Sequence, residues 1–337
     1  RMVAGLRRLG FSKVFDTQFT ADLTIMEEGT EFIHRVKEGG TLPMITSCSP
    51  GWINFIESFY PSLLGHLSTC KSPQQMFGAV AKTFYAQKTG IDPEKIRVVS
   101  IMPCTAKKGE AKRPEMDSSY RFWKEKKAVA PGSSHHFQDV DWALTTRELA
   151  RMMRLAGIEM AKLDEESFDS PLGESTGAAT IFGTSGGVME AALRTVYEIL
   201  EGKPLPDTDF TPVRGLEGIK TAEVPVAGMK VRIAVAHSLK NARILLDQIA
   251  AGASPYHFIE VMTCPGGCVG GGGQPVLPDL DKILARNRSL YAEDTRLPER
   301  KSHLNAEVNS LYKDFLGAPA GHLSHELLHT SYKAHPF

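Results

Sequence analysis

The sequence has no excess of charge, no long apolar segment and few cysteines. It contains 39 basic and 39 acidic residues, so it lacks the basic surface that binds nucleic acids or anionic membranes. No apolar run approaches the roughly 18–20 residues of a membrane span, and no signal peptide is recognised. Its five cysteines are an odd number spread over a long chain, which argues against disulfides and favours thiols kept for metal binding in a reducing compartment. We therefore predict a cytoplasmic protein with no nucleic-acid partner and no membrane span.

The most unusual stretch is the loop from Glu260 to Pro275. Cys264 and Cys268 lie four residues apart in it, and six of the eight residues from 266 to 273 are glycine. So many glycines disfavour helix and strand, and they let backbone N–H groups approach an anionic group. Two thiolates in such a loop predict a metal cluster, because cluster sulfides accept hydrogen bonds from amides. A zinc knuckle is disfavoured because the usual two-residue spacing and a second cysteine pair are missing.

Two further cysteines follow predicted buried strands. The strand Leu42–Thr46 leads to Cys48, and the strand Ile96–Met102 leads to Cys104. Ligands of α/β sheets bind beyond the carboxyl ends of parallel strands, so both loops are candidate ligand sites. We expect Cys48, just before a predicted helix, to have a lowered pKa that suits a ligand or a proton carrier. Incidental burial is the alternative for each thiol, and it is the interpretation we prefer for Cys70.

Charged residues flank these loops. Lys107 follows Cys104 by three residues and can supply positive charge to an anionic centre, with Glu110 fastening the loop; a solvated charge run is the alternative. Glu28 and Glu31 share one face of a predicted helix. If that face meets the core, the two glutamates form a candidate proton relay, and otherwise they are a solvated pair.

Strands that alternate with helices predict an α/β fold with parallel sheets covered by helices. We expect two lobes, each with a small, mainly parallel sheet flanked by helices, and a cluster in the cleft between them. Lobe one is expected at about 1–140 with a polar, irregular surface insertion at 112–139, lobe two at about 141–275, and a helical tail at 276–337. The individual elements include an extended stretch at Val14–Thr24, a helix that starts after Ser72 and a strand at Ala178–Phe182.

The three cysteine loops together resemble the catalytic domain of the [FeFe]-hydrogenases. The signature loops are matched in order at Thr46–Trp52, Met102–Glu110 and Glu260–Pro275, with further matching stretches such as Lys71–Gln75 and Ile181–Glu190. The resemblance extends over essentially the whole chain. It implies reversible hydrogen oxidation and proton reduction at an H-cluster, a [4Fe–4S] cluster joined by a cysteine to a two-iron centre with CO, cyanide and a bridging dithiolate. It also implies H2 and protons as substrates, a ferredoxin or an electron-transfer subunit as partner, and maturation proteins that supply the two-iron cofactor.

The resemblance also implies roles for individual residues. Cys104 and Cys264 match ligands of the [4Fe–4S] cluster, and Cys268 matches the cysteine shared with the two-iron centre. Cys48 matches the thiol that passes protons, and the relay would continue through Glu28, Ser68 and Glu31 to the surface. The pocket of the two-iron centre would be lined by Lys107, which would bind a cyanide, and by Pro103, Met102, Gln74, Met262 and Phe182.

The sequence departs from the family pattern at Ser49, where the family usually has the fourth cluster cysteine. The serine oxygen ligates, or Cys48 moves into ligation, or three cysteines hold the cluster; an oxygen ligand should lower the cluster potential. The family's segment before Arg1 and its ferredoxin-like accessory domains are not matched, so the chain is expected to be a fragment or to start after a removed segment. The alternatives are a non-catalytic relative, either an iron–sulfur assembly factor or an H2 sensor, or the hydrogenase subunit of an NAD-linked bifurcating complex.

Overall fold

Two small sheets organise the chain. The computed structural model describes residues 1–126, 136–275 and 279–335. A four-stranded sheet has the order β1-β6-β5-β4 and a two-stranded sheet pairs β2 with β3. Within the described residues, every pairing of these strands is parallel except the antiparallel pair β4–β5. The strands are β1 (Met44–Ile45), β2 (Val99–Met102), β3 (Trp142–Thr145), β4 (Ile219–Val226), β5 (Met229–His237) and β6 (Phe258–Met262).

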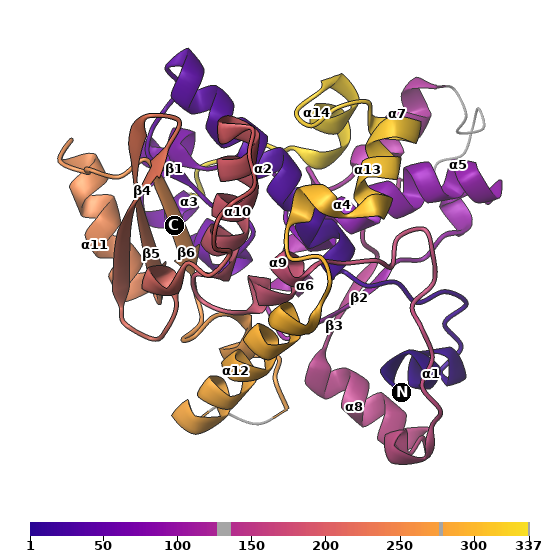
Figure 1. Cartoon of the computed structure of the whole chain (residues 1–337). Helices are drawn as coiled ribbons and strands as arrows, with labels where there is room; N and C mark the ends of the chain where they lie inside the picture. The colour runs from indigo at the N-terminus through magenta and orange to yellow at the C-terminus, as the bar shows by residue number, and fades with distance from the viewer. Residues whose placement is uncertain (127–135, 276–278, 336–337) are drawn as a thin grey trace.

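Helices cover both faces of the four-stranded sheet. In Figure 1, α2 and α10 lie on one side of this sheet and α11 lies on the other. The helices are α1 (Met2–Arg8), α2 (Gln18–Glu38), α3 (Pro50–Phe59), α4 (Pro73–Val80), α5 (Ala86–Thr89), α6 (Lys107–Glu110), α7 (Ser118–Glu125), α8 (Thr146–Leu155), α9 (Gly177–Thr180), α10 (Gly187–Glu201), α11 (Leu239–Ala250), α12 (Leu280–Arg296), α13 (Ala306–Leu311) and α14 (His322–Leu328). No helix in these ranges is both long and apolar enough to cross a membrane.

The central strands are apolar on both faces because each face meets its own core. Ile233 and Val235 of β5 pack into the core that α2 and α10 cover. Ala234 and Ala236, which point the other way, pack into the core that α3 and α11 cover. The alternation follows from the two-residue period of a strand. Sheets buried on both faces hold their strand ends in fixed positions, and these ends carry the cysteine loops.

Each sheet combines strands from the two sides of residue 140. The short strand β1 pairs with β6, and β2 pairs with β3. Neither sheet is confined to one side of residue 140. The division of the chain into two lobes near that residue stays a prediction. The pairing brings the loop after β1 beside the loop after β6, so the first and third cysteine loops become neighbours.

Three local predictions were wrong. Helix α2 starts at Gln18, inside the stretch expected to be extended, because Phe19 and Leu23 face a core at helical spacing. The expected strand Ala178–Phe182 is helical, since a short apolar run does not distinguish a buried strand from a buried helix. The segment 112–139 contains the ordered helix α7; its residues 127–135 lie outside the described ranges.

Candidate cluster site

The glycine-rich loop after β6 docks directly on the end of β2. The amide of Gly273 donates to the carbonyl of Pro103 at 3.0 Å. A Cβ atom at Gly271 would lie 2.1 Å from that same carbonyl oxygen, and one at Gly273 would lie 2.6 Å from the amide nitrogen of Cys104. Only glycine permits so close an approach. The glycines therefore bring Cys104 to the loop that carries Cys264 and Cys268.

The three thiols of these two loops affect one another electrostatically. Burial raises the pKa of Cys264, and the nearby Cys104 raises it further. Burial also raises the pKa of Cys268 to about 12, with contributions from Cys104 and Cys264. As a whole residue Cys268 is nevertheless exposed. A bound cation or cationic cluster would favour the thiolate forms of Cys264 and Cys268.

The first cysteine loop contacts the glycine-rich loop from the side of β1. The hydroxyl groups of Ser49 and Thr263 are 2.9 Å apart, which ties this loop to the residue before Cys264. Cys48 and Phe182 both pack against the core under α10, to which Met262 belongs. The structure thus places these three residues at the same core, and it engages the Ser49 oxygen in a hydrogen bond.

The expectation of a lowered pKa for Cys48 was wrong. Burial raises the pKa of this thiol well above its ordinary value, the Glu28 carboxyl raises it further, and Lys107 lowers it. Ser49, not Cys48, is the N-cap of α3. Cys48 therefore lies one residue short of the helix terminus, and desolvation outweighs any help from the helix amides.

Lys107 joins the first and second cysteine loops. Its ammonium donates to the carbonyl of Cys48 at 3.1 Å and pairs with Glu110 at 2.9 Å. Gln74 donates to the Lys107 carbonyl and to Glu110, each at 3.1 Å, and Ser72 donates to Glu110 at 3.0 Å. Glu110 thus fastens the loop, as predicted, and Gln74 holds the lysine's own backbone.

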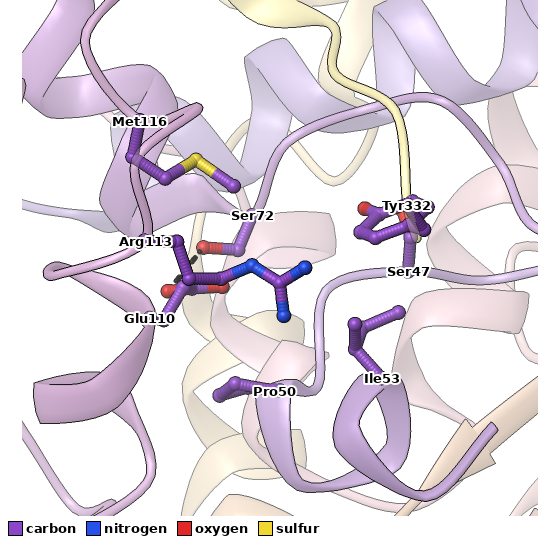
Figure 2. A pocket seen from close by; sticks show the side chains of 8 residues that line it. All are labelled: Ser47, Pro50, Ile53, Ser72, Glu110, Arg113, Met116 and Tyr332. Carbon is purple, nitrogen blue, oxygen red and sulfur yellow. Dashed lines mark hydrogen bonds between the residues drawn. The ribbon is translucent and has the colours of Figure 1, made fainter. Parts of the chain in front are cut away.

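A small pocket adjoins this network on the far side of the first loop (Figure 2). Figure 2 shows Arg113 beside Glu110, with the hydrogen bond from Ser72 to Glu110 behind it. Ser47 and Pro50, which flank Cys48 and Ser49, form part of its wall. The pocket has room for about one water molecule. It is too small for an organic ligand.

The predicted acidic relay lies on the core-facing side of α2. Glu28 is fully buried, and neither of its carboxyl oxygens has a hydrogen-bond partner within the described residues. Burial raises the pKa of Glu28 to about 8, and the Glu31 carboxylate contributes to the rise. Ser68 donates to Glu31 at 2.9 Å, and Arg35 pairs with Glu31 at 2.6 Å. A carboxyl with this pKa both accepts and releases protons near neutral pH.

Several supporting residues escaped prediction. Glu260 is fully buried in β6 and accepts from the amides of Gly186 and Met189, so it holds the start of α10 beside the glycine-rich loop. Arg286 of α12 donates to the Val269 carbonyl of that loop at 2.7 Å. A glutamate within a buried strand was the available signal for Glu260. No local pattern identifies Arg286.

The sequence profile described as "Iron only hydrogenase large subunit, C-terminal domain" matches residues 1–272, and "Iron hydrogenase small subunit" matches residues 280–335. The chain belongs to the iron-only hydrogenase family, and the predicted resemblance is confirmed.

The chain is 52% identical over 339 residues to the NADP-reducing hydrogenase subunit HndD of Solidesulfovibrio fructosivorans, covering 98% of this chain and 55% of that protein. It is 52% identical over 295 residues to the periplasmic [Fe] hydrogenase large subunit of Nitratidesulfovibrio vulgaris, covering 87% of this chain and 66% of that protein. A solved structure of apo [FeFe]-hydrogenase HydA1 from Chlamydomonas reinhardtii, a variant, has 42% identity and a TM-score of 0.83, covering 100% of this chain and 88% of that one. These matches confirm the predicted α/β fold, while the chain spans only part of the length of both relatives.

Proposed function

We propose that this chain is the H-cluster domain of a hydrogenase that catalyses reversible hydrogen oxidation and proton reduction. The observation that carries the proposal is the direct contact of three cysteine loops with one another, beside a buried lysine. Glycines pressed against the β2 end hold Cys104 to the loop of Cys264 and Cys268. A close backbone cradle suits a metal cluster, because cluster sulfides accept hydrogen bonds from nearby amides.

The donor set fits a [4Fe–4S] cluster joined to a two-iron centre. Cys104 and Cys264 would ligate the cluster, Cys268 would join its two parts, and Ser49 would occupy the fourth ligand position. The two-iron centre would lie against Lys107, Pro103, Met102, Gln74, Met262 and Phe182. When bound, the H-cluster supplies the binding and cleavage of the H–H bond, which protein side chains alone do not perform.

The chain's own residues would move the protons. The Cys48 thiol lies close enough to Glu28 for the carboxyl to raise its pKa, and the Ser68 hydroxyl bonds Glu31 at 2.9 Å. A proton would pass from Cys48 to Glu28, then by way of Ser68 to Glu31. Arg35, paired with Glu31, would mark the outer end. The raised pKa of Cys48 keeps the thiol protonated at rest, so after it passes its proton on it readily regains one from Glu28.

Electrons would be exchanged with a ferredoxin or with an electron-transfer subunit, and maturation proteins would deliver the two-iron cofactor. The name of the HndD relative, an NADP-reducing hydrogenase subunit, favours a role as the hydrogenase subunit of an NAD-linked complex as one form of this proposal. We retain the cytoplasm as the proposed compartment from cysteine usage, although one relative is named as periplasmic.

A non-catalytic iron–sulfur relative, either an assembly factor or an H2 sensor, is the second candidate. An assembly factor with a bare [4Fe–4S] cluster has no use for the Lys107–Glu110–Gln74 network or for a buried acid such as Glu28. A sensor that does not turn over does not require the Cys48 relay.

The test is to load the full chain with the two-iron cofactor and measure H2 evolution from reduced viologen, together with the infrared bands of CO and cyanide. Activity with these bands is the expected result. Intact bands without turnover would favour a sensor. A [4Fe–4S] cluster that takes up no diatomic ligands would favour an assembly factor.

A further inference from the structure

Glu31, Cys70 and His329 form a second group of potential metal ligands, separate from the cluster loops. Their ligand atoms all lie within 4.8 Å of one another. Glu31 belongs to α2, Cys70 precedes α4, and His329 follows α14. Cys70 and His329 face each other across an antiparallel bridge. Backbone hydrogen bonds of 2.8 Å hold this bridge on both sides. Three segments far apart in the sequence thus fix the three side chains.

The separations are close to those of a tetrahedral zinc site. The Cys70 sulfur lies 3.8 Å from the Glu31 carboxylate and 4.0 Å from Nδ1 of His329. Zinc bonds of about 2.0–2.3 Å in tetrahedral geometry place ligand atoms roughly 3.3–3.8 Å apart. The Glu31 carboxylate and Nδ1 of His329 lie within 4.8 Å of each other, so this pair must approach by about an ångström to close the group around an ion, a movement that side-chain rotation can supply.

The hydrogen bonds of His329 place its proton on Nε2 and leave a lone pair on Nδ1, the nitrogen that faces Cys70. Nε2 lies 3.0 Å from the Glu27 carboxylate, which also accepts from the Tyr312 hydroxyl and the Ala320 amide. Because the Glu27 carboxylate only accepts hydrogen bonds, its contact with Nε2 requires that nitrogen to carry the proton. Nδ1 is then the acceptor, facing the Thr69 hydroxyl at 2.8 Å. A histidine held through its other nitrogen by a carboxylate is the usual arrangement around zinc.

The surroundings of Glu31 and Cys70 fix both side chains, and an incoming cation would compete with the Arg35 guanidinium, which lies 2.6 Å from Glu31. Glu31 accepts from Arg35, Ser68 and the Thr69 amide, so its carboxylate is fixed in place. Burial and the glutamates of α2 raise the pKa of the Cys70 thiol. A bound dication would reverse this effect, because metal coordination deprotonates a thiol.

We propose that Glu31, Cys70 and His329 bind one Zn²⁺ ion. The Cys70 S–H bond breaks as the Zn–S bond forms, and the proton leaves to solvent. The dication, one thiolate and one carboxylate then sum to zero charge. Water fills the fourth position, and the Thr69 hydroxyl releases Nδ1. Because Glu31 also ends the proposed proton relay, the ion would close that relay; this consequence rests on the proposed function, whereas the binding site does not.

The binding test uses the full chain with its cluster loaded, so that the cluster ligands Cys104, Cys264 and Cys268 are occupied. Zn²⁺ is titrated against a chromophoric chelator, and Cd²⁺ is added to detect metal–thiolate charge transfer in the ultraviolet. We expect one ion per chain. Cys70→Ser and His329→Gln should each weaken binding by about tenfold or more, and Cys70→Ser should remove the Cd²⁺ absorption. A wild-type chain that binds no Zn²⁺, or variants that bind as tightly as the wild type, would overturn the proposal.

Two further variants guard against a general disturbance of the fold. His325→Gln removes the ring stacked on His329 at 4.1 Å and leaves all three ligands, so it should still bind Zn²⁺. Thr69→Val removes the hydroxyl that competes for Nδ1 and should tighten binding. If Thr69→Val binds more weakly than the wild type, Nδ1 is not the ligand atom and the assignment fails.

The activity test separates this proposal from the proposed function. Zn²⁺ should inhibit H2 evolution by the wild type and have little effect on Cys70→Ser. Binding without inhibition would leave the site standing and refute Glu31 as the end of the relay. A chain without hydrogenase activity would refute the proposed function, while the chelator titration would still decide the metal site.

Discussion

Replacing Glu28 with glutamine should stabilise the protein at high pH and at the same time block proton transfer. Glu28 is fully buried, and its carboxyl oxygens have no hydrogen-bond partner in the described part of the chain. A glutamine amide has the same shape and an equally unpartnered environment. The substitution therefore changes mainly one thing, which is the ability of the side chain to ionise.

The size of the stability effect follows from the pKa. Burial raises the pKa of Glu28 from 4.5 to about 8. Between these two values the folded protein holds a proton that the unfolded chain has released, so the free energy of unfolding falls as the pH rises. Each pH unit removes about 1.4 kcal/mol, which sums to about 5 kcal/mol by pH 8 and stays level above it. Glu28→Gln lacks this loss, so its advantage should be near zero at pH 4.5 and several kcal/mol at pH 9.

The measurement is urea denaturation of wild type and Glu28→Gln at pH 5 and pH 9, with H2 evolution assayed on the same preparations. Activity should fall by about a hundredfold or more, because glutamine neither accepts nor releases a proton. Glu38→Gln is the matched control, since Glu38 lies exposed at the end of the same helix, and it should change neither quantity. An identical pH dependence in wild type and Glu28→Gln would refute the protonated, buried state of Glu28. Full activity in Glu28→Gln would refute its place in the relay.

Three other substitutions test the packing of the cysteine loops. Gly271→Ala should prevent docking of the glycine-rich loop and lower the amount of bound iron, because its Cβ would lie 2.1 Å from a carbonyl oxygen. Gly272→Ala, with its nearest contact at 3.5 Å, should bind iron normally, and equal iron contents in the two variants would refute the role of the close glycine contact in cluster binding. Lys107→Met should lower the free energy of unfolding by about 3–5 kcal/mol, because it leaves the Glu110 carboxylate without its ion-pair partner. Adding Glu110→Gln should restore much of the lost stability, and a double variant whose loss equals the sum of the two single losses would refute the energetic coupling of Lys107 and Glu110. Ser49→Cys should raise the cluster potential in an EPR redox titration if the Ser49 oxygen is a ligand, and an unchanged potential would exclude that ligation.

The sequence by itself determined the ligand loops and the class of the fold. Runs of apolar residues marked the strands β2, β5 and β6, and the glycines from 266 to 273 marked a backbone that must approach something closely. Both signals are local, because strand propensity and glycine's freedom act on the residue that carries them. The order of the loops also identified the family, which the comparisons confirmed.

Tertiary packing alone decided which side chains face which. Glu27, Glu28 and Glu31 lie within about one turn of α2 and look alike in sequence. Only the cores on either side decide that Glu28 has no hydrogen-bond partner among the described residues while Glu27 accepts three hydrogen bonds. The raised pKa of Cys48 likewise depends on burial, which a loop sequence does not encode. His329 reaches Cys70 across 259 residues of chain. Such contacts arise because the sheets bring distant segments together, and no local pattern records them.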